Sequence, residues 1–335
     1  MKQFDLIYYC DGYPEIGMGH VFRGIDIVNA YIKKHSLTKI AIQGRYHSQS
    51  MNFIREQLNS KITILNSNDS AQSDCSIIDT MFYPGEQRIN QQYFSEVRKK
   101  CSTLIFLWDV LEYKTPDEVD IVINHSPCSN IYGGRDVKKY LGLEYAPIPS
   151  SFYEIDNYRM KEGTILSVIG SSNRPDLIDS FLKHLEKLET KVEKIVILSP
   201  SFNKSILNQF QQKFKSIIFK QNVSKLENYI REASVIVTTY GNTTFQSMAS
   251  KIPTFTVAFQ GFQNLYGEKL ESAGYCVNLG MFEDLQIEKL SLITNDDFKI
   301  EMHEKLKEKF VSPGIDKIIS IISENLTKDK IHIYK

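Results

Sequence analysis

The chain has 335 residues, of which 42% are hydrophobic, and its 40 basic and 40 acidic side chains give a formal net charge of zero. This length suffices for two cores of ordinary size and is long for one, so we expect two domains. The balanced charge points neither to nucleic acid nor to an anionic membrane surface as a partner. The five scattered cysteines include no Cys-x-x-Cys pair, which argues against a disulfide framework and a zinc site and favours a reducing compartment.

The N-terminal residues already have the pattern of a strand and lack the apolar segment and small-residue cleavage site of a signal peptide. No apolar run approaches the roughly 20 residues that span a bilayer. We therefore expect a cytoplasmic protein without a transmembrane segment, which leaves peripheral association with a membrane open.

Strands and helices alternate in the first half of the chain. Strands are predicted at 4–9, 40–43, 61–65, 75–79, 103–109 and 120–124, with helices at 21–32, 51–58 and 87–100. Several of these short apolar strands end at an acid or amide, including Asp79 and Asn124. The pattern is typical of a parallel doubly wound sheet with polar side chains along its carboxyl edge, where such sheets bind ligands.

A second series of the same kind follows a junction near residue 150. Its predicted strands are 164–169, 194–198, 216–219, 234–239, 253–258 and 275–279, and the tail from 282 is mostly helical with a break at Pro313-Gly314. We predict an α/β protein with an N-terminal Rossmann-like domain at 1–150, a C-terminal one at 151–320 and a tail at 321–335. Two such domains facing each other would have a ligand cleft between their carboxyl edges.

The first candidate site is the loop from Asp11 to Arg23, which contains Gly17, Gly19 and His20. Two glycines let the backbone turn sharply and approach a ligand. His20 falls at a helix N-terminus, where unpaired N–H groups and the helix dipole favour a neutral imidazole that can act as a base. The structural alternative is a tight turn with His20 as a cap. Phe22 occupies the place of the third glycine of the dinucleotide fingerprint, so a nicotinamide cofactor is not favoured.

The second candidate site lies in the C-terminal half, where two strands end in loops of glycine and hydroxyl residues. Backbone N–H groups and hydroxyls in such loops suit a diphosphate, although an ordinary threonine N-cap is an equal alternative. Two loops of this kind in one domain favour a single nucleotide site. The residues are Gly170, Ser171, Ser172, Thr239, Gly241, Thr243 and Thr244.

Four segments together resemble a known enzyme family. They are Asp11…Ile16-Gly17-x-Gly19-His20-x-x-Arg23, Ile77-Ile-Asp79, Gly142-Leu-Glu-Tyr145-Ala and Gly241-x-Thr243…Pro253. They resemble the UDP-sugar hydrolase family of pseudaminic acid biosynthesis, a nonulosonic acid pathway. That family is similar in turn to the inverting GT-B glycosyltransferase that adds N-acetylglucosamine in peptidoglycan assembly.

The resemblance implies a GT-B fold, a nucleotide held mainly by the C-terminal domain and a sugar lying against the N-terminal domain. It implies that His20 activates water for attack at the anomeric carbon with inversion and that no metal or separate cofactor is needed. We assign catalysis to His20 and Asp11. The remaining expected contacts are with the sugar (Gly17, Gly19, Arg23, Asp79, Asn124 and Tyr145) and with the nucleotide (the seven loop residues above, Gln246 and Gln263).

The chain departs from the family pattern around the nucleotide. Gln246 stands where the family has a glutamate for the ribose, and Phe262-Gln263 replaces an Asn-Gln pair. UDP, CMP and other carriers therefore stay open. We expect a hydrolase that releases the nucleotide from an activated amino or deoxy sugar. The alternatives are a GT-B glycosyltransferase that builds a surface polysaccharide from a UDP- or CMP-sugar, with a glycan as acceptor, and a nucleotide-sugar-binding protein without turnover.

Overall fold

The computed structural model describes residues 2–13, 18–79, 91–108, 112–127, 130–132, 137–155, 162–170, 174–199, 202–223, 225–310 and 312–326. The chain forms two compact units, which we call unit 1 (Met1–Pro149 with Pro313–Lys335) and unit 2 (Ser150–Ser312). The first boundary lies next to the predicted one, whereas the second differs from the prediction. Helix α11 (Gly314–Leu326) belongs to unit 1, although the sequence analysis placed residues up to 320 in the second domain.

Unit 1 is built on a parallel sheet of seven strands. Their bounds are β1 (Lys2–Tyr9), β2 (Ile40–Gly44), β3 (Thr63–Asn66), β4 (Ala71–Ile78), β5 (Cys101–Trp108), β7 (Ile121–Asn124) and β9 (Lys138–Leu141), in the spatial order β3-β2-β1-β4-β5-β7-β9. A separate pair is formed by β6 (Glu112–Lys114) and β8 (Asn130–Tyr132). The edge strand β9 was not predicted, because it is partly exposed and begins with two lysines.

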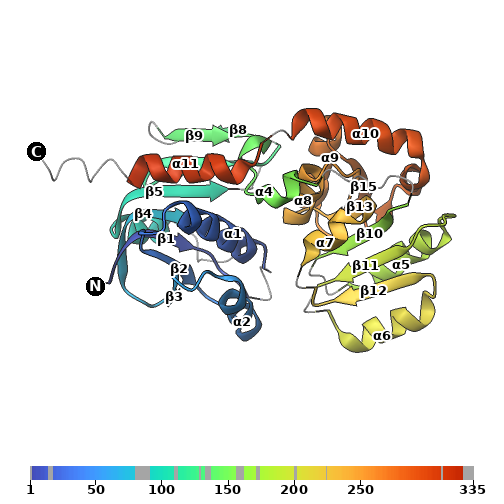
Figure 1. Ribbon diagram of the computed structural model, residues 1–335, viewed down its shortest axis with the longest axis horizontal. Coiled ribbons are helices and arrows are strands. Elements are labelled where there is room, and N and C mark those ends of the chain that lie inside the picture. Colours follow the sequence, from blue (N-terminus) through green and yellow to red (C-terminus); the bar gives the residue numbers. More distant parts are fainter. Residues whose placement is uncertain are drawn as a thin grey trace, which may run out of the picture. The chain divides into compact units, whose positions relative to one another are not determined.

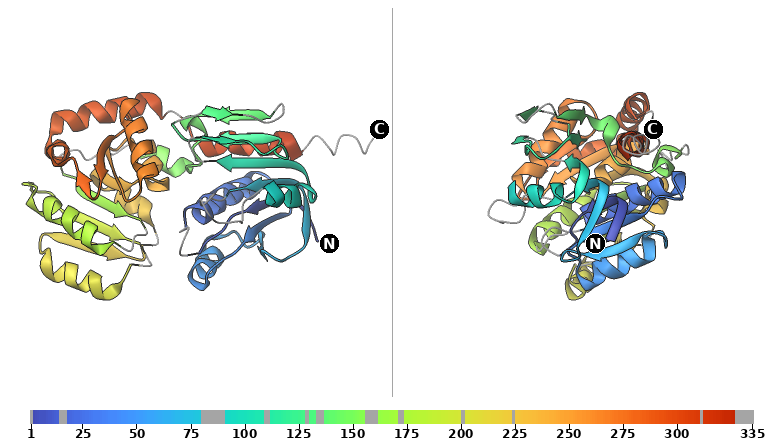
Figure 2. Two further views of the ribbon diagram at one scale, coloured as in Figure 1. Left: turned by 180° about the vertical axis from the view of Figure 1, so that it is seen from behind. Right: turned by 90° about the vertical axis from the view of Figure 1, so that its left-hand side faces the viewer.

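Helices cover both faces of this sheet. Helices α1 (Gly19–Lys34), α2 (Ser48–Gln57) and α11 share one core with β1 residues such as Leu6 and Tyr8, and α1 and α11 run side by side (Figure 1). The spacing of Val21, Ile25 and Val28 places one apolar stripe of α1 in that core. The opposite face packs against α3 (Gln91–Arg98), seen in blue-green from behind in Figure 2. This helix lies within the predicted 87–100 segment, of which 87–90 fall outside the described residues.

Unit 2 repeats the plan. Its strands are β10 (Thr164–Ile169), β11 (Lys194–Leu198), β12 (Ile217–Gln221), β13 (Ala233–Thr239), β14 (Thr254–Ala258), β15 (Val277–Met281) and β16 (Asp284–Leu285), in the order β12-β11-β10-β13-β14-β15-β16. Among the described strands of this sheet, β15 and β16 pair antiparallel, and the other neighbouring strands pair in parallel. The main helices are α5 (Pro175–Lys187), α6 (Lys204–Lys213), α7 (Leu226–Arg231), α8 (Asn242–Ala249), α9 (Gly261–Ser272) and α10 (Asp296–Lys309).

Both sheets reverse their strand order at one place. In unit 1 the chain moves outward from β1 in one direction and then, with β4, in the other, and in unit 2 it does so at β10 and β13. A crevice outside the carboxyl ends of the strands at such a point is the usual ligand site of an open parallel sheet. The residues that follow β1, β4, β10 and β13 are therefore the ones whose contacts bear on function.

Candidate active site

A single buried carboxylate organises the carboxyl edge of unit 1. Asp79 directly follows β4, and its backbone N–H donates to the carbonyl of Tyr9 on the neighbouring strand at 2.9 Å. Its side chain is 0% exposed. One carboxylate oxygen, Oδ2, accepts from the Tyr8 hydroxyl at 2.5 Å and from Arg23 Nε at 2.8 Å. The other, Oδ1, accepts from Arg23 Nη2 and lies 2.7 Å from His20 Nδ1.

The first turns of α1 bring two of these partners to Asp79. His20 and Arg23 are three residues apart, so they lie on the same side of the helix, and they are only 4% and 3% exposed. Gly24 allows this close approach of α1 to β1, because a Cβ at this position would lie 2.7 Å from a ring carbon of Tyr8. The helix thus carries the imidazole and the guanidinium directly onto the carboxylate.

The charges of this cluster are settled by burial and by its partners. Burial by itself raises the pKa of Asp79, but the attraction of Arg23 and then of His20 outweighs it and holds that pKa well below its usual range. Burial, followed by the charge of Asp79, raises the pKa of Tyr8 well above its ordinary value. At neutral pH Asp79 is therefore a carboxylate and Tyr8 a hydroxyl donor. Because a carboxylate only accepts, the short contact assigns a proton to His20 Nδ1 and a lone pair to Nε2 in the neutral ring.

In unit 2, a hydrogen bond joins the ends of the two strands at the reversal point. The backbone N–H of Gly170, just after β10, donates to Oγ1 of Thr239, the last residue of β13, at 3.1 Å. Beyond Thr239 the chain turns into α8, and the Gly241 N–H donates to the buried Thr244 hydroxyl at 3.2 Å. Thr244 lies in the first turn of α8, and its hydroxyl binds the N–H of the residue that precedes the helix. The N-cap position itself is occupied by Gly241 and not by a threonine. Gly241 and Thr243 are half-buried at the start of α8.

Comparison with known proteins identifies the fold. The structure of MurG from Acinetobacter baumannii matches with a TM-score of 0.64 at 12% identity, covering 96% of this chain and 99% of that one. A glycosyltransferase from Rickettsia africae matches with a TM-score of 0.61 at 12% identity, covering 98% and 100%. UDP-glucose:anthocyanidin 3-O-glucosyltransferase in complex with UDP matches with a TM-score of 0.59 at 10% identity, covering 97% and 100%. The chain has the GT-B fold.

Sequence comparison adds little to this GT-B assignment. No protein-family model matches the chain. An uncharacterized protein of Methanocaldococcus jannaschii is 23% identical over 260 residues, which are 72% of this chain and 53% of that protein. The chain thus spans about half the length of the curated relative that it matches.

The remaining predicted residues of the first GT-B unit lie in other surroundings. Asp11 accepts from the backbone N–H of Arg45 at 2.8 Å and from its Nη2 at 3.2 Å, and the Arg45 guanidinium lies 4.4 Å from the centre of the Tyr13 ring. The carboxylate bonded to His20 is thus Asp79, and a catalytic role for Asp11 stays a prediction. Gly19 is exposed at the start of α1, and Gly17 lies outside the described residues.

Asn124 and Tyr145 have local structural contacts. The fully buried Asn124 accepts from the Ser126 N–H at 2.7 Å, which shapes the turn after β7. Tyr145 ends a short 3₁₀ turn, η1 (Leu143–Tyr145), and its ring lies 5.6 Å from that of Tyr140 and 5.3 Å from the Lys317 ammonium. These contacts tie η1 to β9 and α11. Binding of a sugar by either residue stays a prediction.

The glutamines predicted to bind the nucleotide lie on two helices of unit 2. Gln263, on α9, accepts from the Phe259 N–H at 3.0 Å and so helps to fix the loop after β14. Gln246 is half-buried on α8. Ser171 and Ser172 lie outside the described residues.

One member of the Asp79 cluster was missed by the sequence analysis as a functional residue, and a second has a sequence signal of low weight. Tyr8 was read only as part of an apolar strand, although a polar tip on the strand face that meets α1 is a signal for a buried partner. His125 is 1% exposed, and its Nε2 lies 3.5 Å from Arg23 Nη1. Its signal was the position directly after β7, beside Asn124.

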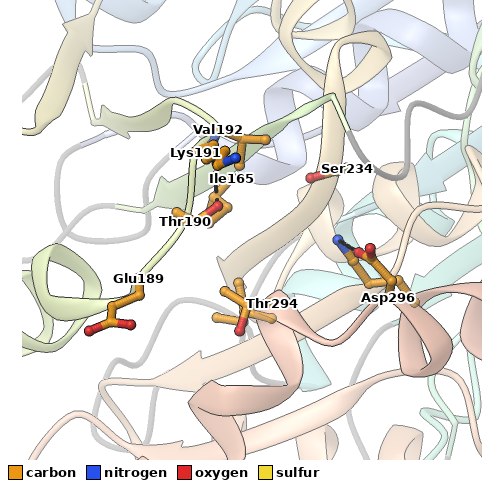
Figure 3. Close-up of a pocket in the computed structure, with 10 residues that line it drawn as sticks. Ile165, Glu189, Thr190, Lys191, Val192, Ser234, Thr294 and Asp296 are labelled. Atoms are coloured by element: carbon orange, nitrogen blue, oxygen red, sulfur yellow. Dashed lines mark hydrogen bonds and ion pairs between the residues drawn. The ribbon is translucent and has the colours of Figure 1, made fainter.

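Two cavities lie away from the candidate sites. One, of about 170 Å³, lies at the amino ends of β10 and β13, beside Ile165 and Ser234, where Asp296 binds Lys299 at 2.7 Å (Figure 3). The other, of about 850 Å³, lies at the amino ends of β5, β7 and β9 beside Thr103, Ile121 and Lys138. Both are at the sheet edges opposite to the residues discussed above.

The described part of the chain contains neither a cluster of metal-binding side chains nor a helix that could span a membrane. No three His, Cys, Asp or Glu side chains in it come close enough to hold a metal ion. Within the same residues, no helix has both the length and the apolar character of a membrane span.

Proposed function

We propose that this chain is a glycosyltransferase that moves a sugar from a nucleotide carrier to an acceptor hydroxyl, with inversion at the anomeric carbon. The observation that carries the proposal is the buried contact of 2.7 Å between His20 and Asp79 at the strand reversal of unit 1. Support for the reaction class comes from the GT-B fold, since the similar structures include proteins named as glycosyltransferases, one of them in complex with UDP. Fold alone does not fix an activity, so the site has to carry the argument.

The residues of unit 1 provide a general base. Because His20 Nδ1 donates to Asp79, Nε2 has the lone pair that takes the proton from the acceptor hydroxyl. The acceptor oxygen then bonds to the anomeric carbon, and the bond from that carbon to the phosphate oxygen breaks, with its electron pair leaving on the nucleotide. Asp79 stays ionised and stabilises the imidazolium that forms.

The residues of unit 2 would hold the phosphates. The N-terminus of α8 provides N–H groups and the positive end of a helix dipole, and Thr243 adds a hydroxyl on its first turn. Such groups stabilise the negative charge that grows on the leaving phosphate. We propose that the charge is carried by these groups and not by a metal ion, so EDTA should leave turnover unchanged.

A hydrolase is the second candidate. Its support is the motif of residues 11–23, since two of its side chains, His20 and Arg23, bind the same carboxylate. In this case water takes the place of the acceptor and gives its proton to the same nitrogen. The substrate would be an activated amino or deoxy sugar, as in the family that the motif resembles.

The test is a panel of UDP- and CMP-activated sugars, including amino sugars, incubated with and without glycan acceptors and with and without EDTA. Release of nucleotide only in the presence of an acceptor supports the transferase, and release without one supports the hydrolase. Binding of a nucleotide sugar without release would contradict both and leave a binding protein.

A matched pair of variants tests the assignment of the base. His20→Ala should lower kcat by about 10²–10⁴-fold, the usual range for a general base, while nucleotide affinity measured by calorimetry is kept. The control is His184→Ala, on α5 of unit 2, which should keep full turnover. Unchanged turnover in His20→Ala would show that the base has been assigned to the wrong residue.

A further inference from the structure

The guanidinium of Arg23 lies beside the same ring nitrogen that donates to Asp79. Arg23 Nη2 is 2.9 Å from His20 Nδ1, and this nitrogen is 2.7 Å from Asp79 Oδ1. In the plane of a neutral ring, Nδ1 has either a proton or a lone pair. It can therefore donate to Asp79 or accept from Arg23, but it cannot do both in one tautomer.

The protonation state of Asp79 decides between these tautomers. An ionised carboxylate only accepts and so holds the ring proton on Nδ1. A protonated carboxyl group could donate to Nδ1, which would move the ring proton to Nε2 and remove the lone pair that a general base needs. The position of one proton on Asp79 thus controls whether His20 can take a proton through Nε2.

Arg23 is the group that keeps this carboxylate ionised. Burial is the largest influence on the pKa of Asp79 and raises it, whereas Arg23 is the strongest influence that lowers it. The guanidinium binds both oxygens at once, through Nε to Oδ2 at 2.8 Å and through Nη2 to Oδ1. A paired contact of this kind fixes the orientation of the carboxylate as well as its charge. His125 Nε2 lies 3.5 Å from Arg23 Nη1 and contacts the far side of the guanidinium.

We propose that Arg23 is a positioning residue that acts through Asp79: by binding both carboxylate oxygens it holds the His20 proton on Nδ1 and leaves Nε2 as the proton acceptor. The kinetic consequence rests on the proposed function, but the position of the ring proton is a property of the protein without substrate. The titratable and charged groups around Asp79 come from β1 and its end (Tyr8 and Cys10), from α1 (His20 and Arg23) and from the end of β7 (His125).

The direct test is nitrogen NMR of the full-length protein with ¹⁵N-labelled histidine, near pH 7.5 and without substrate. His20→Gln identifies the His20 signals. The wild-type protein should have its ring proton mainly on Nδ1, and Arg23→Gln should move the majority to Nε2, because Asp79 then takes up a proton. Arg23→Lys keeps a positive charge but loses the paired contact, so a mixture of tautomers is expected. The control is Arg98→Gln, which removes another arginine–aspartate pair of unit 1, at 2.9 Å from Asp120, and should keep the wild-type tautomer.

The kinetic test separates positioning from a merely structural role. With a nucleotide sugar that the wild-type protein turns over, Arg23→Gln should lower kcat about 100-fold at pH 7 and change KM by less than about threefold. Its kcat should rise again at higher pH as Asp79 loses its proton, and Arg23→Lys should recover part of the loss. An equal loss at every pH, or a wild-type tautomer in Arg23→Gln, would overturn the proposal.

The outcomes also distinguish this proposal from the proposed function. If the wild-type protein turns over no nucleotide sugar, the proposed function fails, and the NMR comparison still decides the role of Arg23. If Arg23→Gln does not fold, as judged by circular dichroism, Arg23→Lys carries the test. A wild-type tautomer and wild-type kcat in Arg23→Lys would then contradict the need for the paired contact.

Discussion

Asp79→Asn should destabilise unit 1 strongly, although the change keeps the shape of the side chain. It leaves the guanidinium of Arg23, which is 3% exposed, without the opposite charge that balances it. It also replaces one acceptor by an NH₂ group where all the partners (the Tyr8 hydroxyl, His20 Nδ1 and two guanidinium nitrogens) donate. Removing one member of a buried ion pair costs about 3–5 kcal/mol, and we expect a loss of this size in the free energy of unfolding.

Hydrogen exchange makes this loss measurable in unit 1 alone. Exchange of the β1 and β4 amides at increasing urea concentration, measured by mass spectrometry of peptides from these strands, follows the unfolding of that unit even where the whole chain does not unfold in one step. With a urea dependence of about 2 kcal/mol per molar, the expected loss moves the midpoint down by about 1.5–2.5 M at pH 7.

A double variant tests the reasoning behind that value. In Asp79→Asn with Arg23→Met, the unbalanced charge is gone, so the double variant should be more stable than Asp79→Asn alone. Folding lowers the pKa of Asp79, so the stability that its carboxylate contributes is fully present above the usual pKa of an aspartate. This stability is lost as the pH falls from there towards the lowered pKa of the folded state. A loss in the free energy of unfolding below about 1 kcal/mol for Asp79→Asn at pH 7 would refute the argument, because an exposed ion pair contributes that much. Additive losses in the double variant would refute it as well.

Three further substitutions, one of them with a control variant, test other parts of the molecule. Burial raises the pKa of Asp26, on α1, to about 7, so Asp26→Asn should stabilise unit 1 more at pH 8 than at pH 5, by about 2–3 kcal/mol in urea unfolding. The sign follows because the raised pKa makes the folded state lose stability as the pH rises from about 4 to about 7. Gly314→Ala places a Cβ 2.3 Å from the carbonyl oxygen of Ala146 and should lower the free energy of unfolding by about 1–3 kcal/mol in the same assay. The control is Gly261→Ala, whose Cβ would meet no atom within 4 Å. It should change the stability measured in circular dichroism melts by less than about 0.5 kcal/mol. Thr239→Val removes the acceptor of the Gly170 N–H and should weaken UDP binding, measured by calorimetry, about tenfold. Unchanged affinity would show that this hydrogen bond does not contribute to nucleotide binding.

The two sheets could be predicted from the sequence because each strand carries its own signal. Short apolar runs such as 164–169 and 234–239 are buried along their whole length or nearly so, which is typical of parallel strands covered on both faces. The place of α11 could not be predicted in this way. Its isoleucines show that one face must be buried, but not in which core. That is decided by the packing of Ile318 and Ile322 in the core of unit 1.

The candidate site was predicted as polar residues at one sheet edge, but the direct contact between His20 and Asp79 was not predicted. His20 and Arg23 stood in one motif, and Asp79 at the end of a distant strand. Their contact depends on the pairing of β1 with β4, in which Tyr9 lies opposite Ile78. Strand order is a property of the whole sheet, so the sequence did not pair His20 with Asp79, and the catalytic assignment went to His20 and Asp11 of the same motif. The structure places Asp11 with Arg45, at the end of β2.

In the proposed reaction the two reversal points carry out different chemistry, and the burial of their residues agrees with that difference. Acid–base chemistry needs ionisable groups with fixed partners, and Asp79, His20 and Arg23 are all at most 4% exposed. Anion binding needs N–H groups that a ligand can reach, and Gly170 is exposed while Gly241 and Thr243 are half-buried. A buried charged cluster contributes to folding as well as to function, because each member balances another. Substitutions at Asp79 or Arg23 should therefore lower activity and stability together, whereas Thr243→Ala should lower nucleotide affinity without lowering the stability of unit 2. Equal stability losses at both reversal points would show that the loop before α8 is a structural turn and not a ligand site.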